Sequence, residues 1–428
     1  MSEKSIHRSD ASFESVLENA LNALKRMRQE NLSLDEYLDD FNADMVMRRR
    51  AASLLFIYFR RKNQLENAIL PHCRKKPERS LLDMLSLALA AAHYQNALAT
   101  ESVVNIAVDL CKKLYNIHTA RFVNALMRRA LESIDKLDVH LLPSEIYSRW
   151  SKRFGNEKTS VLEKLFAAEA VPAVRLRSGF ETAEESFEIV KSIETPWKFF
   201  YCRDLGSVLK SGNFARGAYY IQDIAPALVC GLLAKHRELL PGEAALLDLC
   251  AAPGGKLIMN MELLQELHCR IKCAVAVDRS ARRLELVKSN LHRCGVDAAT
   301  IAADASDKSL LAGEKFEVVT CDVPCSNSGV FRRRPDALHR WSNAELKKIV
   351  PLQQSILENA ARLTAERGLI LYSTCSLETE ENQQVISSFL QNHPDFELIE
   401  EQLFMPQADC DGTFGALLYR VSEKSNSK

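Results

Sequence analysis

The chain has 428 residues, and its 56 Lys and Arg side chains are balanced by 56 Asp and Glu side chains, so its formal net charge is zero. This balance excludes a protein that binds nucleic acid as an overall polycation. Hydrophobic residues make up 47% of the chain and charged residues 26%, which is an ordinary globular composition rather than a disordered or fibrous one. At roughly 150 residues per domain, the length predicts two or three domains.

The sequence predicts neither a membrane span nor a secretory signal. The longest uncharged stretch, from Met84 to Thr100, contains polar side chains and is shorter than the roughly 20 apolar residues that a span needs. The charges at the N-terminus are not followed by an apolar segment. We therefore expect a cytoplasmic protein whose 12 cysteines are reduced thiols, and no metal site, because no zinc-finger spacing occurs.

Residues 1–140 predict a helical domain. Apolar side chains recur at helical spacing over 103–114 and again over 123–131, with charged side chains elsewhere on each wheel. No glycine occurs before Gly155, which is typical of a packed helical bundle. The first 44 residues hold ten acidic and five basic groups, and we assign them no role beyond solubility or contact with a partner.

A concentration of basic side chains follows this acidic segment. Residues 48–79 hold ten basic groups against two acidic ones. If the basic side chains share one face, they could release counterions from a phosphate backbone; a solvated helix face is the alternative. The candidate RNA contacts in this segment are Arg48, Arg49, Arg50, Arg60, Arg61 and Lys62.

Residues 141–235 predict a small α/β linking module, and residues 236–428 predict a larger α/β domain. Prolines and glycines break the module into short mixed segments. In the larger domain, apolar runs alternate with segments of helix length, which favours a parallel sheet with crossover helices. The expected strands are 244–249, 273–278, 316–322 and 368–374, and the expected antiparallel pair at the sheet edge is 396–400 with 415–421.

Capping signals define two helices of the larger domain. Ser280 can cap a helix that ends at Gly295, and Ser342 followed by Glu345 forms a capping-box pattern. Pro351 is expected to kink or restart the helix that follows Ser342, because proline lacks the N–H that a helix needs.

A nucleotide-shaped cleft is predicted where the first strands end. Gly254 and Gly255 let the backbone approach a ligand closely, and the helix after them offers free N–H groups. Asp278 ends the next strand, where a carboxylate can accept both hydroxyls of a ribose, and Asp304 after a third strand could meet an adenine amino group. With Asp248 these residues describe an adenosine site, although each alone is more often a turn or cap residue. The loop consists of Cys250, Ala251, Ala252, Pro253, Gly254, Gly255 and Lys256.

Two cysteines follow two later strands, at the edge where open α/β sheets bind their ligands. Cys325 comes shortly after Asp322, and Cys375 follows the strand 368–374. For each of them, a buried structural cysteine is the alternative. A thiolate that adds to carbon 6 of a pyrimidine makes carbon 5 nucleophilic enough to take a methyl group, and Asp322 could bind the amine and ring nitrogen of a cytosine. The residues alone do not decide which cysteine attacks and which assists release.

Three segments, DLCAAPGGK, DVPCSNSG and YSTCS, closely resemble the RNA cytosine-5 methyltransferases of the RsmB (Sun, Fmu) and nucleolar-protein group. GAYYIQDIAPALV and DGTFGALLYR extend the resemblance, and the helical region is similar to the NusB-like RNA-binding domain of the bacterial RsmB branch. The resemblance implies a class I methyltransferase domain, with a Rossmann-like, mainly parallel sheet, after an all-α NusB-like domain. It also implies a function, the methylation of carbon 5 of a cytosine in 16S ribosomal RNA.

The same resemblance implies roles for the site residues. Cys375 matches the family's nucleophile, and Cys325 matches the cysteine that helps to release the product. The implied cofactor, S-adenosylmethionine, would contact residues 250–256, Asp278, Asp304 and Asp322. Three glutamates after the nucleophile suit a helix start but oppose a lowered thiol pKa: Glu378, Glu380 and Glu381. We expect a monomer with no DNA or membrane partner.

An arginine-rich stretch after the Pro-Cys loop resembles the family's R-R-x-P-D segment. We expect it to contact RNA phosphates; a solvated loop is the alternative. Its candidate RNA contacts are Arg332, Arg333, Arg334 and Arg340. The chain departs from the family pattern at two positions, because Arg177 replaces an asparagine of the linking module and Asn327 replaces a frequent glycine of the Pro-Cys loop.

Two other functions are compatible with the sequence. The same chemistry could act on a cytosine of transfer RNA, since the ribosomal assignment rests on the NusB-like domain alone. The chain could also be a non-catalytic NusB-like RNA-binding assembly factor with a retired enzyme domain. The intact loop, the two cysteines and Asp322 favour an enzyme over this second alternative.

Overall fold

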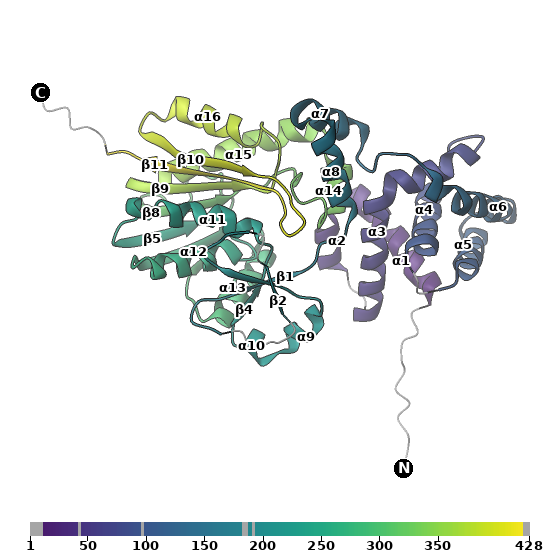
Figure 1. The fold of residues 1–428 in the computed structure, drawn as a ribbon, viewed down its shortest axis with the longest axis horizontal. Helices are drawn as coiled ribbons and strands as arrows, with labels where there is room; N and C mark the ends of the chain where they lie inside the picture. The colour runs from purple at the N-terminus through teal and green to yellow at the C-terminus, as the bar shows by residue number, and fades with distance from the viewer. Residues whose placement is uncertain (1–11, 42–43, 96–97, 182–186, 191–192, 423–428) are drawn as a thin grey trace, which may run out of the picture. The chain divides into compact units, whose positions relative to one another are not determined.

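The computed structural model describes residues 12–41, 44–95, 98–181, 187–190 and 193–422. Residues 1–11 and 42–43 of the acidic N-terminal segment thus lie outside the described residues. The chain divides into two compact units (Figure 1). Unit 1 comprises Met1–Ala168 and Arg334–Arg340, and unit 2 comprises Glu169–Arg333 and Trp341–Lys428.

Unit 1 contains helices and no strands in its described residues, in agreement with the helical pattern of residues 1–140. Its helices are α1 (Phe13–Glu30), α2 (Leu34–Asp40), α3 (Met45–Ile69), α4 (Arg79–Tyr94), α5 (Thr100–Leu114), α6 (Ile117–Ser133), α7 (Ser144–Phe154), α8 (Asn156–Ala167) and α14 (Pro335–Arg340), with 3₁₀ turns η1 (Leu70–His72) and η2 (Ile134–Lys136). Helix α4 is central, because every residue from Leu81 to Ala91 is buried. Its buried Asp83 is balanced by Arg28 and Arg79, whose guanidinium nitrogens lie 2.6 and 2.8 Å from the carboxylate.

Helices α7 and α8 extend unit 1 beyond the boundary expected at residue 140. Trp150 of α7 is fully buried, with its ring 5.9 Å from that of Phe166 on α8. Arg61 on α3 donates to the carbonyl of Ala167 at the end of α8, 3.3 Å away. These contacts explain why the two helices belong to unit 1 rather than to the linking module expected at residues 141–235.

Helix α14 belongs to unit 1, although in the sequence it lies more than 160 residues after the other helices of that unit. The backbone N–H of Leu34 donates to Asp336 Oδ2, 3.1 Å away. His339 Nε2 lies 2.7 Å from the carbonyl oxygen of Phe59 on α3, and donates to it because a carbonyl only accepts. Burial lowers the pKa of His339 to about 4, so the ring is neutral at pH 7.

Unit 2 is built on a seven-stranded sheet with the order β10-β11-β9-β8-β5-β6-β7. Its strands are β5 (Glu243–Asp248), β6 (Arg270–Asp278), β7 (Ala299–Ala302), β8 (Phe316–Asp322), β9 (Thr364–Thr374), β10 (Phe396–Phe404) and β11 (Thr413–Arg420). Strands β5 to β9 are parallel, whereas β10 and β11 pair antiparallel and close one edge. The expected strands, the antiparallel pair and the α/β class are therefore confirmed.

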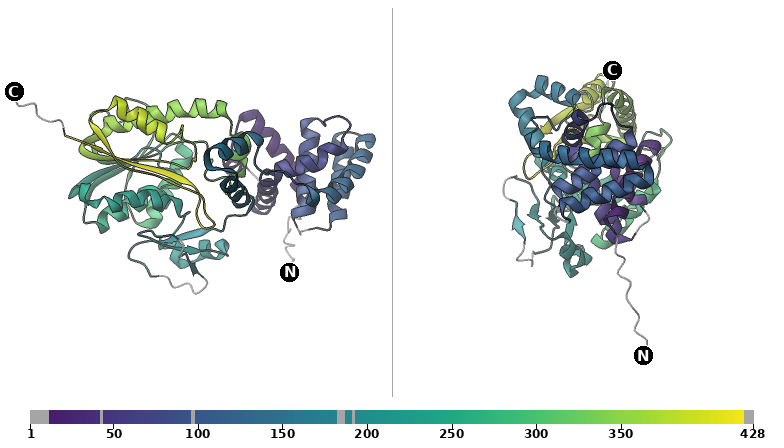
Figure 2. Two further views of the ribbon diagram at one scale, coloured as in Figure 1. Left: turned by 45° about the horizontal axis from the view of Figure 1, so that its top comes forward. Right: turned by 90° about the vertical axis from the view of Figure 1, so that its right-hand side faces the viewer.

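Helices cover both faces of this sheet (Figures 1 and 2). One face carries α11 (Ala225–Lys235), α12 (Gly255–Glu266) and α13 (Ala281–Cys294), with the 3₁₀ turn η3 (Arg237–Leu239), and the other carries α15 (Asn343–Leu363) and α16 (Gln383–Asn392). Ser280 caps α13 and Gly295 ends it in the left-handed region, as predicted. The expected restart at Pro351 is wrong, because α15 continues through this exposed proline while residues on both sides of it are buried.

A small antiparallel sheet precedes the large one. It has the order β2-β3-β1-β4, with strands β1 (Ala173–Leu176), β2 (Glu188–Ile189), β3 (Lys198–Tyr201) and β4 (Tyr219–Ile221). Two short helices, α9 (Leu205–Lys210) and α10 (Gly212–Ala215), lie between β3 and β4 in the sequence. Buried Arg175 and Arg177 both pair with Glu262 on α12. Arg177 also donates to the carbonyls of Gly217 and Cys294, 2.9 and 2.7 Å away, so the residue that departs from the family pattern ties the small sheet to the large domain.

Within the described part of the chain, no helix combines the length and the apolar character that a membrane crossing requires.

Candidate active site

Three neighbouring strands bring the predicted site residues together. Strands β9, β8 and β5 are adjacent in the sheet, and their carboxyl ends carry Thr374, Asp322 and Asp248. In the register of the sheet, Asp322 lies opposite Ser373, one residue before the end of β9. Because the carboxyl ends of parallel strands meet at one edge, the loops that carry Cys325 and Cys375 also start there.

The loop after β5 is held by the end of the next strand. The N–H of Ala252 donates to Asp278 Oδ2, 3.2 Å away, and the N–H of Ser280 donates to Asp278 Oδ1 at 2.9 Å. Gly254 has a φ of 100°, which favours glycine, and α12 begins at the next residue. A Cβ atom on Gly255 would lie 2.8 Å from Nε2 of Gln222 and 3.1 Å from the ring of Tyr220, so a side chain here would displace Gln222.

Asp304 lies just beyond β7 rather than at its last residue. Ser306 donates both its hydroxyl and its N–H to Asp304 Oδ1, at 2.6 and 2.8 Å. These two hydrogen bonds lower the pKa of Asp304, so the exposed carboxylate is ionised at pH 7. Oδ2 receives neither of the two Ser306 hydrogen bonds.

Lys256 at the start of α12 reaches the neighbouring strand end. Its Nζ lies 2.6 Å from Asp322 Oδ2, while Ser373 donates to Asp322 Oδ1 at 2.8 Å. Burial lowers the pKa of Lys256, but the charge of Asp322 and its hydrogen bond raise it above the usual value. Behind this pair, burial and the charge of Asp322 raise the pKa of Asp248 to about 7. The sequence places Lys256 in the cofactor loop, and the structure shows that it also contacts Asp322, the carboxylate beside the two cysteine loops.

The two cysteines predicted to react lie side by side. Their Sγ atoms are 3.1 Å apart, and Cys375 donates to Asn327 Oδ1, also 3.1 Å away. Asn327 Nδ2 donates to the carbonyl of Cys325 at 3.0 Å, which fixes the amide with its oxygen toward the thiol. Asn327 has a φ of 61°, in the left-handed region that explains the frequent glycine here. The hydrogen bond with Cys375, together with burial, raises the pKa of Cys325.

A buried polar network underlies the two thiols, and sequence reasoning gave it no role at the site. Glu381 is fully buried and accepts the N–H of Ser326 at 2.7 Å and Gln353 Nε2 at 3.0 Å. It also accepts the hydroxyls of Ser326 and Ser376. Burial raises the pKa of Glu381, whereas these four hydrogen bonds lower it, and the net effect is upward. The signal available in the sequence was that a serine directly follows each cysteine.

Arg332 and Arg333, which are expected to contact RNA, both have partners within the protein. Arg332 is 3% exposed, and it donates to the carbonyl of Ala408 at 2.6 Å and to Asp411 at 3.2 Å. Arg333 bridges Asp411 and Asp223, with its nitrogens 2.7 and 2.6 Å from their carboxylates. Burial raises the pKa of Asp411 to about 6 despite these arginines.

The remaining candidates in this stretch also have protein partners. Arg334 lies 3.1 Å from Asp35, and Arg340 lies 3.1 Å from Asp336. All four of these residues belong to unit 1. Both arginines are partly exposed, so solvent screens these ion pairs.

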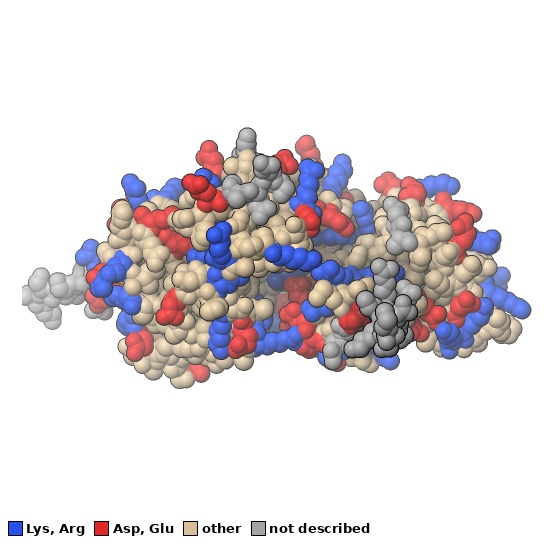
Figure 3. Space-filling model, turned by 90° about the horizontal axis from the view of Figure 1, so that it is seen from below, with Lys and Arg blue, Asp and Glu red and all other residues tan. Residues whose placement is uncertain are grey.

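The six basic candidates on α3 do not form one free basic face. Arg60 is buried, Arg61 is bonded to the end of α8, and Lys62 lies 2.9 Å from Glu66. Arg48 and Arg49 are exposed and Arg50 is half-buried, so only this end of the helix keeps the predicted character. On the face shown in Figure 3, basic and acidic side chains are interspersed.

Replacing Arg333 by alanine is expected to lower the free energy of unfolding by about 3 kcal/mol, because it leaves the carboxylates of Asp223 and Asp411 close together with one cation fewer. Urea denaturation measures the effect. Arg334→Ala is the control, and its exposed ion pair should contribute at most about 1 kcal/mol. Wild-type stability with weakened RNA binding in Arg333→Ala would restore the phosphate-contact assignment.

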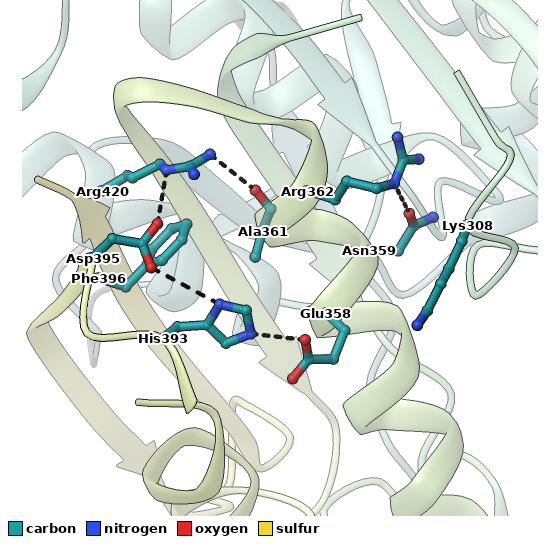
Figure 4. A pocket seen from close by; sticks show the side chains of 9 residues that line it. All are labelled: Lys308, Glu358, Asn359, Ala361, Arg362, His393, Asp395, Phe396 and Arg420. Carbon is teal, nitrogen blue, oxygen red and sulfur yellow. Dashed lines mark hydrogen bonds and ion pairs between the residues drawn. The ribbon is translucent and has the colours of Figure 1, made fainter. Parts of the chain in front are cut away.

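A cavity of about 260 Å³ lies at the opposite edge of the large sheet, where β10 begins and β11 ends (Figure 4). Its charged side chains pair with one another. His393 Nε2 lies 2.7 Å from Glu358, and Arg420 Nε lies 3.0 Å from Asp395. The cavity therefore belongs to the packing of α15 and α16 against the sheet edge and is separate from the cysteines.

Comparisons with known proteins show which families the two parts of the chain resemble. Residues 238–417 match the family model for 16S rRNA methyltransferase RsmB/F, and residues 14–132 match the NusB family. The chain is 27% identical over 418 residues to the probable ribosomal RNA small subunit methyltransferase B of Bacillus subtilis strain 168, with 90% of each chain covered. It is 31% identical over 302 residues to ribosomal RNA small subunit methyltransferase B of Xylella fastidiosa strain 9a5c, with 68% of each covered. The crystal structure of PH0851 has the same fold, with a TM-score of 0.72 at 21% identity over 95% of this chain and 98% of that chain.

Proposed function

Because this chain belongs to the RsmB/F family of 16S ribosomal RNA methyltransferases, we propose that it methylates carbon 5 of a cytosine in small-subunit ribosomal RNA through a covalent cysteine adduct. The observation that supports this chemistry best is the pair of thiols of Cys325 and Cys375, 3.1 Å apart, at the sheet edge that also carries the Lys256–Asp322 ion pair. A nucleophile, a second thiol and a carboxylate are the groups that cytosine methylation at carbon 5 needs.

The residues at the cofactor end fit S-adenosylmethionine. The glycine pair brings backbone N–H groups of α12 to the sheet edge, where Gly255 carries no side chain between the backbone and a ligand. Asp278 accepts one N–H on each oxygen, which leaves lone pairs for the ribose hydroxyls. When bound, S-adenosylmethionine supplies an electrophilic methyl group. Residues 250–256, Asp278 and Asp304 would hold it, and Asp322 would lie toward the cytosine.

Cys375 is the proposed nucleophile. Its sulfur adds to carbon 6 of the cytosine, which gives carbon 5 the electron density that accepts a methyl group. Asp322 is proposed to bind the exocyclic amine and ring nitrogen and so stabilise the ring while the adduct exists. Lys256 lies beside Asp322 and close enough to Cys375 for their charges to interact, so it keeps this carboxylate in place.

Cys325 is the proposed assistant of product release. After methyl transfer, the proton on carbon 5 must leave before the C5–C6 double bond can re-form and the sulfur of Cys375 can depart. The thiol of Cys325 is in direct contact with that of Cys375, which supports this division of roles.

The test is the product. Wild-type protein is incubated with methyl-labelled S-adenosylmethionine and, in parallel, with unmodified small-subunit RNA, assembled small subunits and transfer RNA, and the nucleosides are identified by mass spectrometry. We expect 5-methylcytidine in small-subunit RNA. Label on another atom would contradict the chemistry, label on transfer RNA alone would contradict the substrate, and absence of S-adenosylmethionine binding would favour the assembly-factor alternative. Cytoplasmic location and a monomeric state remain part of this proposal.

A further inference from the structure

We propose that Glu381 is a positioning residue that fixes the two cysteine loops relative to each other, so that the nucleophile and the thiol that assists release face the same cytosine. This role rests on the proposed function. The two loops come from different strands, since Cys325 follows β8 and Cys375 follows β9. Each loop therefore needs a tie to the other if the thiols are to stay within reach of one base.

Glu381 makes this tie with both of its carboxylate oxygens. Oε1 accepts the N–H of Ser326 at 2.7 Å and Gln353 Nε2 at 3.0 Å. Oε2 accepts the hydroxyl of Ser326 in the first loop and the hydroxyl of Ser376 in the second. Two of these donors, the N–H of Ser326 and Nε2 of Gln353, can only donate, and a carboxylate accepts all four hydrogen bonds on its two oxygens.

The serines extend the tie to the cysteines themselves. Ser326 and Ser376 are the residues next to Cys325 and Cys375, and their hydroxyl oxygens are 3.2 Å apart. The N–H of Gly329 donates to the carbonyl of Cys375 at 2.9 Å, which is a further hydrogen bond between the two loops. Glu381 does not contact either thiol in the hydrogen bonds described, so it acts through the serines and does not itself react.

The substitution Glu381→Gln tests the role, because glutamine has the same shape but carries no charge and offers one acceptor oxygen where the carboxylate accepts four hydrogen bonds on two. We expect kcat to fall by about 10²-fold, the loss typical of a displacement of about 1 Å between reacting groups, with an unchanged KM for RNA and unchanged affinity for S-adenosylmethionine. A second measurement reports on the thiols alone. The oxidant diamide takes up the hydrogens of two adjacent thiols as their disulfide forms, and we expect the Cys325–Cys375 disulfide to form at least about tenfold more slowly in the variant.

Control variants separate positioning from folding. Glu397→Gln changes an exposed glutamate of β10 and should match wild type in both measurements. Ser326→Ala keeps the carboxylate and removes one hydroxyl donor, so it should show a smaller loss of the same kind if Glu381→Gln does not fold. Wild-type rates of turnover and disulfide formation in Glu381→Gln would overturn the proposal. The proposal would also be overturned if Glu381→Gln lost cofactor affinity as many-fold as it lost turnover and its melting temperature fell as well, because the substitution would then act on the whole fold.

The disulfide measurement needs neither RNA nor cofactor, so the two proposals fail separately. If wild-type protein does not methylate a cytosine but Glu381→Gln still slows disulfide formation, the function is wrong and the positioning role stands. If wild-type protein methylates and forms the adduct while the variant behaves as wild type, the positioning role alone is wrong.

Discussion

Replacing Cys375 by alanine is expected to lower kcat for methyl transfer by at least about 10³-fold, because the substitution removes the sulfur that is proposed to bond to carbon 6. Affinity for S-adenosylmethionine should stay within about twofold of wild type, since the described hydrogen bonds of the Cys375 thiol go to Cys325 and Asn327 and not to residues 250–256. Turnover and equilibrium binding of the cofactor measure the two parts.

The control for this variant is Cys273→Ala, which removes an exposed thiol of β6 and should leave kcat unchanged. Retention of most of the activity in Cys375→Ala would contradict the assignment of the nucleophile. If activity were instead lost in Cys325→Ala without an adduct, the two cysteines would have exchanged roles.

Replacing Cys325 by alanine is expected to trap the enzyme on its substrate. The sulfur of Cys375 can still add to the cytosine, but the thiol that contacts it at 3.1 Å is gone, so release should slow by about 10²–10⁴-fold, the usual contribution of a general acid or base. A covalent protein–RNA band on a denaturing gel measures the adduct.

The band should require both RNA and cofactor, and should disappear in the Cys325→Ala/Cys375→Ala double variant. A band that persists in the double variant would show that another residue attacks. Normal turnover without a band in Cys325→Ala would show that this thiol has no part in release.

The fold of the large domain could be predicted because its signals are local. Apolar runs of strand length mark β5, β6, β8 and β9, and a serine and a glycine mark the two ends of α13. The path of α15 through Pro351 could not be predicted in this way, because burial of the helix on both sides of the proline outweighs a local cost. Nor could the place of α14, since His339 bonds to Phe59, 280 positions away in the chain.

In the candidate site, too, the residues marked by local signals could be predicted, and those that depend on distant partners could not. Strand ends predict Asp322, Cys325 and Cys375, because parallel strands deliver their ends to one edge whatever the rest of the fold does. The ion pairs of Arg333 could not be predicted, because its partners, Asp223 and Asp411, lie 110 and 78 positions away, and a run of basic residues has the same sequence pattern whether it faces solvent or a buried carboxylate. Glu381 was missed for the same reason, since its role depends on a serine 55 positions earlier.

Because unit 1 is discontinuous in the sequence, it cannot be completed until residues 334–340 have been synthesised. The ribosome makes residues up to Ala168 early, but α14 emerges only after about four fifths of the chain has been made. Until then the N–H of Leu34 lacks the carboxylate of Asp336, and α3 lacks the helix that carries His339. The nascent helical unit must therefore wait for a segment encoded inside the catalytic domain. A transplant of the first 168 residues to another protein would carry this unit without one of its helices.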